Sequence, residues 1–296
     1  MWKIKDILEH AKLFHASDVH LVHRVAPILR IHGEIRQIKG EQLTREDLHS
    51  LLHEIASPRQ IEHFEQKQQL CFSTTFEGVG RVRVSVYYQA LIPEMSIRVC
   101  ETRIRTLEEL GLPQVLEDFA RYPYGLVLVT GPTGTGKTTT LNVMVDIINQ
   151  EQRKKIVMIE DPVEFVHHNS KSIVIQQEVL TDIPTFQEAL VGVLRQDPDV
   201  IVIGEMRSLE TIETALTAAE TGHLVIATLH TPDSVQSIQR IQTVFPAAQQ
   251  NLINMQLANS LQAVISQRLL PRADGKGRAL AYEVCIVNYA IRNKIR

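Results

Sequence analysis

Residues 126–138 read Leu-Val-Leu-Val-Thr-Gly-Pro-Thr-Gly-Thr-Gly-Lys-Thr, an apolar run followed directly by a glycine-rich loop. The loop matches the pattern G-x-x-x-x-G-K-[ST], and residues 139–148 after it have a helical pattern. Such a loop surrounds phosphate oxygens with backbone N–H groups, and the following helix N-terminus favours their negative charge. The stretch therefore predicts a phosphate-binding loop between a buried strand and a helix.

The loop assigns separate tasks to its residues. Lys137 is expected to reach the β- and γ-phosphates, and the Thr138 hydroxyl is expected to hold Mg²⁺. The full set predicted to bind nucleotide is Gly131, Pro132, Thr133, Gly134, Thr135, Gly136, Lys137, Thr138 and Thr139.

Short apolar strands continue on the C-terminal side of the loop. Residues 156–159, 200–203 and 224–227 are apolar without alternation, as buried parallel strands are. Helical patterns intervene, including residues 208–221 with Gly222 as the stop signal. Residues 107–296 are therefore predicted to be an α/β domain with a mostly parallel sheet.

Residues 1–106 have a different pattern and predict a small α+β domain. Ile4, Leu8 and Leu13 are expected on one helical face, and Thr44 is expected to cap a helix over residues 44–56. Residues 80–88 alternate strictly, which predicts a half-buried strand with Arg81 and Arg83 on its open face.

Composition excludes several classes of protein. The formal net charge is 31 − 34 = −3 with no basic block, which gives no support for nucleic-acid binding. Apolar runs fall far short of the roughly 20 residues that span a bilayer, and the N-terminus has no apolar signal region. The three cysteines lie far apart without a CxxC pair, and the histidines lack ligand spacing, so no structural metal is expected.

Carboxylates follow two of the predicted strands. Glu205 comes after residues 200–203 and is the candidate general base, the alternative being an ordinary surface carboxylate. Glu160, Asp161 and Glu164 follow residues 156–159 and form a negative field suited to Mg²⁺, although Asp-Pro is also a common turn.

Two histidines bracket the last of these strands. His223 precedes residues 224–227, and His230 follows shortly after them. We interpret both as candidate γ-phosphate sensors; the alternative is that each is a polar cap at a strand end.

Together these segments resemble a known family. Residues 131–138, 159–164, 200–207 and 221–231 resemble the phosphate loop, aspartate box, atypical Walker B and histidine box of the type II/type IV secretion ATPases. The resemblance implies a PAS-like N-terminal domain, a RecA-like ATPase domain, ATP and Mg²⁺ as cofactors and a homohexameric ring. It also implies catalytic roles for Glu205, Lys137, Glu160, Glu164, Arg83, Arg98 and His230, with Arg81 as a further candidate.

The end of the chain resembles one branch of that family. Residues 290–296 (Ala290, Ile291, Arg292, Asn293, Lys294, Ile295 and Arg296) resemble the A-I-R-N-L-I-R signature of pilus retraction motors, with Lys294 in place of Leu. This implies an ATP-hydrolysing motor that powers type IV pilus retraction and twitching motility. It would act in the cytoplasm at the inner-membrane pilus base, on a platform protein and indirectly on the pilin machinery.

Some alternatives remain open at this point. The chain could be a regulatory, weakly hydrolysing nucleotide-binding paralogue of such a motor. A replication-type P-loop ATPase fits less well, because no basic, aromatic-lined stretch for a nucleic-acid strand is visible. Residues 290–296 could transmit motion without affecting hydrolysis, or Ile291 and Ile295 could simply complete the core.

Overall fold

The computed structural model describes residues 2–100, 103–273 and 277–296. The chain forms two compact units. Unit 1 comprises Met1–Arg103, Asp161–Val166 and Glu178–Asp182; unit 2 comprises Ile104–Glu160, His167–Gln177 and Ile183–Arg296. Two short segments from beyond residue 106 therefore pack with unit 1, which the sequence pattern did not indicate.

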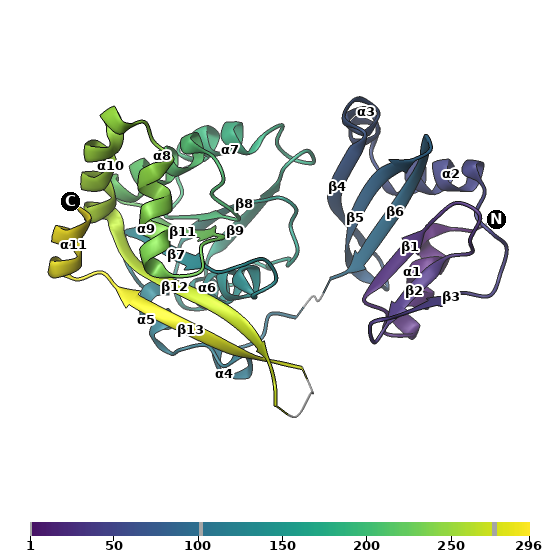
Figure 1. Cartoon of the computed structure of the whole chain (residues 1–296), viewed down its shortest axis with the longest axis horizontal. Helices are drawn as coiled ribbons and strands as arrows, with labels where there is room; N and C mark the ends of the chain where they lie inside the picture. Colours follow the sequence, from purple (N-terminus) through teal and green to yellow (C-terminus); the bar gives the residue numbers. More distant parts are fainter. Residues whose placement is uncertain (1, 101–102, 274–276) are drawn as a thin grey trace. The chain divides into compact units, whose positions relative to one another are not determined.

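Unit 1 is built on a six-stranded antiparallel sheet in the order β3-β2-β1-β6-β5-β4 (Figure 1). Its elements are α1 (Ile4–Leu13), β1 (Asp18–Leu21), β2 (Ile28–Ile31), β3 (Glu34–Gln37), α2 (Arg45–Ile55), α3 (Pro58–Lys67), β4 (Gln69–Phe76), β5 (Gly80–Gln89) and β6 (Ile92–Val99).

Local sequence accounts for most of these elements. Thr44 caps α2 through a reciprocal capping box with Asp47, as the sequence predicted for the helix start. Alternate residues of β5 are buried, again as expected. The expectation for Leu13 is wrong: its side chain is 72% exposed. Nine helical positions at 100° each place Leu13 on the face of α1 opposite to the buried Ile4.

Unit 2 is an α/β domain around a seven-stranded sheet in the order β13-β12-β7-β11-β10-β8-β9 (Figure 1). Its elements are α4 (Leu107–Leu110), α5 (Val115–Ala120), β7 (Gly125–Thr130), α6 (Lys137–Glu151), β8 (Lys155–Glu160), β9 (Ile173–Glu178), α7 (Phe186–Val193), β10 (Val200–Ile203), α8 (Leu209–Glu220), β11 (Leu224–Leu229), α9 (Ser234–Thr243), α10 (Ala247–Ser260), β12 (Leu261–Pro271), β13 (Arg278–Ile286) and α11 (Tyr289–Ile295).

The central strands of unit 2 are parallel, and β13 pairs antiparallel at one edge. Alternate residues of β7 enter two separate cores: one is shared with α7, α8, α9 and α10, the other with α4, α5 and α6. Burial on both faces explains the unbroken apolar sequence of these strands. The predicted α/β class with a mostly parallel sheet is confirmed.

Candidate functional site

The carboxyl ends of parallel strands meet at one edge of the unit 2 sheet. The loop 131–136 follows β7, Glu160 ends β8, Glu205 follows β10, and His230 follows β11. In open α/β sheets ligands bind at this edge. The fold thus gathers groups that lie about a hundred positions apart in the sequence.

The glycine-rich loop joins β7 to α6 through left-handed backbone. Gly131 has a φ of 142°, and a Cβ there would lie 2.3 Å from the Gln267 carbonyl oxygen on β12. Only glycine permits this close approach. The loop is thereby fixed against the sheet, with α6 starting at Lys137.

Lys137 is held inside the loop. Its Nζ donates hydrogen bonds to the Gly131 oxygen (2.8 Å) and the Pro132 oxygen (3.0 Å) and lies 3.2 Å from His230 Nδ1. Burial lowers the pKa of the Lys137 ammonium, although the charge of Glu205 opposes this shift. Phosphate oxygens would give this desolvated cation a stronger, charge-assisted acceptor than the two carbonyls.

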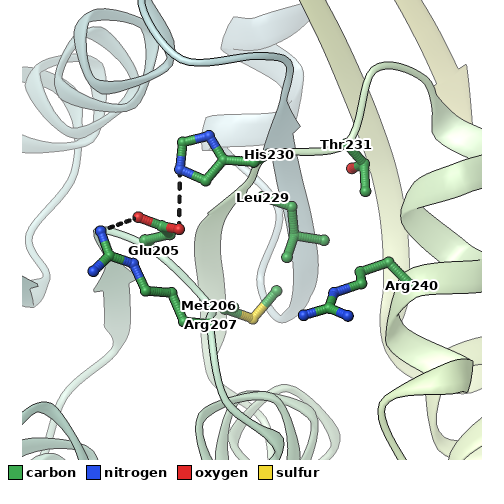
Figure 2. A pocket seen from close by; sticks show the side chains of 7 residues that line it. All are labelled: Glu205, Met206, Arg207, Leu229, His230, Thr231 and Arg240. Carbon is green, nitrogen blue, oxygen red and sulfur yellow. Dashed lines mark ion pairs between the residues drawn. The ribbon is translucent and has the colours of Figure 1, made fainter.

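The Glu205 carboxylate lies between the Arg207 guanidinium and the His230 ring, as Figure 2 shows. Its Oε2 lies 2.7 Å from Arg207 Nη2, and its Oε1 lies 2.9 Å from His230 Nε2. Burial acts to raise the pKa of the Glu205 carboxyl, but Arg207 and His230 outweigh it, and the pKa lies below its ordinary value. The group is therefore a carboxylate at neutral pH and can accept a proton.

His230 connects the loop with this carboxylate, because its two ring nitrogens face Lys137 and Glu205 respectively. Glu205 and His230 also line a pocket of about 230 Å³. The lining residues are Glu205, Met206, Arg207, Leu229, His230, Thr231 and Arg240 (Figure 2).

Glu160 is buried at the end of β8, where its Oε1 accepts a hydrogen bond of 2.9 Å from Gln176 Nε2. Gly204 lies beside it: a Cβ at position 204 would sit 3.1 Å from the Ile159 oxygen and 3.5 Å from Glu160 Cα. A side chain at position 204 would therefore be tight against the Ile159 oxygen. Thr138 and Thr139 lie in the first turn of α6.

His223 lies elsewhere. It precedes β11, and its backbone oxygen accepts from the Gly125 nitrogen at the start of β7, so it sits at the amino edge of the sheet. Its ring contacts Ala218 and Thr221 at the end of α8. A six-residue strand, about 20 Å long, separates this edge from the loop. We therefore correct the sensor assignment of His223; His230 does lie beside the loop, and its sensor role stays a prediction.

The arginines proposed from the sequence belong to unit 1. Arg83 Nη1 pairs with Glu164 Oε1 at 3.1 Å, and Arg98 Nε pairs with Asp18 Oδ1 at 3.1 Å. Arg81 does not lie free on an open face as expected, because its Nη2 pairs with the buried Glu178 at 2.9 Å. That contact is one of several that join the Glu178–Asp182 segment to the rest of unit 1.

Residues 290–296 lie almost entirely within α11, which packs on its own unit. Ile295 is buried in the core and Ile291 is half-buried against it, whereas Lys294 is exposed. The Arg292 guanidinium donates to the Ala258 and Asn259 carbonyls at the end of α10. The packing favours the alternative in which these isoleucines complete the core.

Sequence reasoning missed several polar residues of this region, namely Arg207, Asn142, His167 and Gln176. The available signal was Asn142, a polar residue inside the apolar helical stretch 141–148 directly after the loop. Within residues 2–100, 103–273 and 277–296, no group of three or more His, Cys, Asp or Glu side chains is arranged to hold a metal ion. Over the same residues, no helix is long and apolar enough to cross a membrane.

The family model for type II/IV secretion system proteins matches residues 2–293. The chain belongs to this family. It is 44% identical over 293 residues to the type IV pilus retraction ATPase PilT of Pseudomonas aeruginosa, covering 99% of this chain and 85% of that protein. It is 43% identical over 270 residues to a twitching motility protein of Neisseria gonorrhoeae, covering 91% and 72%.

A solved structure agrees with this assignment to the secretion ATPases. The crystal structure of the pilus retraction motor PilT with bound ADP matches with a TM-score of 0.94 and 46% identity, covering 100% of this chain and 86% of that one. The RecA-like fold expected from the resemblance is thereby confirmed.

Proposed function

We propose that this secretion ATPase hydrolyses ATP to power type IV pilus retraction. The observation that carries the proposal is the Lys137–His230–Glu205 arrangement, which joins a phosphate-binding lysine to an ionised carboxylate across one histidine. The similarity to the P. aeruginosa retraction ATPase over nearly the whole chain supports the choice of motor.

Each residue then has a chemical task. Lys137 neutralises charge on the β- and γ-phosphates, and Glu205 accepts a proton from the attacking water. His230 and Arg207 orient the Glu205 carboxylate.

Mg²⁺ fits this donor set. The Thr138 hydroxyl and the Glu160 carboxylate are hard oxygen groups, and such a site draws its remaining ligands from phosphates and water. The metal supplies charge neutralisation on the phosphates when bound. We assign Thr138 as its protein ligand, with Glu160 behind it.

The remaining parts of the proposal concern assembly. We propose a homohexameric ring that acts at the inner-membrane pilus base through a platform protein. In such a ring, the unit 1 groups proposed to contribute to catalysis are Arg83, Arg98 and Glu164. The Arg98 side chain is 66% exposed and so has freedom to move.

Steady-state ATP hydrolysis of the purified chain tests the enzyme, with Glu205→Gln as the probe. Glutamine keeps size and hydrogen bonding but cannot take the proton, so turnover should fall by about 10²-fold or more with ATP binding nearly unchanged. Glu213→Gln, an exposed carboxylate on α8, is the matched control.

Complementation of a strain lacking its retraction ATPase tests the motor. Restored twitching by the wild-type chain and failure of Glu205→Gln are expected. Wild-type hydrolysis near background, with nucleotide binding intact, would instead favour the accessory paralogue.

A further inference from the structure

Asn142 occupies an unfavourable place for its type. It lies fully buried in α6, one turn after Thr138, and its Nδ2 donates to the Thr138 carbonyl oxygen at 2.8 Å. Asparagine in a helix interior competes with the backbone for hydrogen bonds and is disfavoured there. Such departures from local preference concentrate at functional sites.

The other end of the Asn142 amide meets a buried histidine. Asn142 Oδ1 lies 2.7 Å from His167 Nε2, and His167 is 7% exposed. Because the amide nitrogen faces the Thr138 carbonyl, the oxygen faces the ring, so Nε2 carries the hydrogen. Burial lowers the pKa of His167 to about 4, which keeps the ring neutral.

The polar contacts continue to the aspartate box. The backbone N–H of His167 donates to Gln176 Oε1 at 2.9 Å, and Gln176 Nε2 donates to Glu160 Oε1 at 2.9 Å. One polar chain, formed by Asn142, His167 and Gln176, thus links the first turn of the phosphate-loop helix with Glu160. All of its members belong to unit 2.

We propose that Asn142 and His167 are positioning residues that set the placement of Thr138 relative to Glu160 and so tune binding of the Mg²⁺–nucleotide complex. The inference rests on the proposed function, because it names the residues that support the metal side of that site. It assigns them no contact with the reacting atoms.

Groups one step removed from a metal typically change metal affinity or activity by about 10- to 100-fold when they are altered. Loss of the His167 donor leaves the buried Asn142 oxygen unsatisfied and frees the amide to turn away from Thr138. The backbone N–H groups of the loop, which bind phosphate without metal, are untouched. The defect should therefore appear in the Mg²⁺-dependent part of nucleotide affinity.

The neighbourhood offers three comparison variants. Asn149 lies two turns further along α6 than Asn142. Its side chain forms hydrogen bonds with the His168 oxygen and the Ser170 nitrogen, directly after His167, and does not contact the phosphate loop. His168 is the exposed neighbour of His167. Asn149→Ala therefore controls for loss of hydrogen bonds between α6 and residues 168–170. His168→Leu controls for replacing a histidine by leucine at a neighbouring position. His167→Gln returns an N–H near the Nε2 position.

The experiment measures binding of a fluorescent ADP analogue to the full chain with Mg²⁺ and with EDTA, alongside thermal melting. The readout is the gain in affinity that Mg²⁺ provides. His167→Leu should reduce this gain about tenfold, and His167→Gln should restore most of it. Asn149→Ala and His168→Leu should keep the wild-type gain, although Asn149→Ala melts earlier.

The inference is overturned if His167→Leu weakens binding equally with and without Mg²⁺, or if Asn149→Ala reproduces the loss. If the leucine variant does not fold, His167→Gln is tested alone, and the inference is overturned if this variant lacks the wild-type gain in affinity from Mg²⁺. It is also overturned if Mg²⁺ gives the wild-type chain no gain in affinity. A wild-type chain that binds with the gain but does not hydrolyse ATP refutes the proposed function only.

Discussion

Glu178 is a buried carboxylate of unit 1 that accepts several hydrogen bonds. It is 1% exposed and accepts from the Ser73 nitrogen (3.0 Å), the Val163 nitrogen (3.0 Å) and Arg81 Nη2 (2.9 Å). The Ser73 and Thr181 hydroxyls also donate to it. The Glu178 side chain therefore links both later segments of unit 1, Asp161–Val166 and Glu178–Asp182, to the unit 1 sheet.

Glu178→Gln keeps the shape but replaces one acceptor oxygen by a donor. The amide can face Thr181, whose hydroxyl can rotate, but it then opposes the Ser73 N–H, which costs about 1–3 kcal/mol when buried. Arg81 also loses its charged partner. Breaking a buried pair in this way costs about 3–5 kcal/mol in total.

Urea unfolding of the full chain, followed by tryptophan fluorescence, measures this effect. The sequence has a single tryptophan, Trp2, which packs against the unit 1 core, so its emission reports on that unit. We expect the free energy of unfolding reported by Trp2 to fall by about 3–5 kcal/mol. Glu65→Gln, an exposed carboxylate on α3, should change it by less than about 0.5 kcal/mol. Equal unfolding curves for the two variants would refute the reasoning.

Four further outcomes follow from the structure of unit 2. Lys137→Ala should weaken ADP binding and ATP turnover together, and wild-type turnover in it would place the site elsewhere. Ile295→Ala should lower the free energy of unfolding by about 2–4 kcal/mol by leaving a cavity. Deletion of residues 290–296 should reduce the melting temperature and the ATPase activity together. If the deletion instead stopped retraction alone, the hypothesis that this segment transmits motion would be restored. His167 has a pKa of about 4 in the fold against 6.5 when unfolded, so the unfolded chain binds the proton first and stability declines as pH falls from 6.5 towards 4. Between pH 7 and pH 5 the loss from this residue is about 2 kcal/mol, and urea midpoints at the two pH values should differ less in His167→Gln.

The comparison of sequence with structure separates two kinds of inference. The loop at residues 131–138 was predictable because phosphate binding imposes its glycines, lysine and threonine at fixed spacing. The strands β7, β8, β10 and β11 were predictable because burial on both faces leaves an unbroken apolar run. Glu205 and His230 followed from their position after such strands, since carboxyl ends of parallel strands share one edge.

The errors have different causes: the one over Leu13 is local, because 100° per residue places it opposite Ile4, whereas the one over Arg81 is not. His223 precedes β11, and chain direction already places a residue before a parallel strand at the amino edge of the sheet, away from the loop. Arg81 and Arg83 alternate as an open face requires, yet Arg81 meets Glu178 from 97 positions away. No local pattern contains that partner.

The sequence by itself determined the fold class, the phosphate loop and the family, because each depends on local spacing or on burial that repeats with the period of a helix or strand. Only the tertiary structure decided that His230 joins Lys137 to Glu205, that α11 completes a core, and that Asn142, His167 and Gln176 form one polar chain to Glu160. These contacts join residues 9 to 93 positions apart. Their geometry is set by how strands and helices pack, and side-chain hydrogen bonds of this kind leave no periodic trace in the chain.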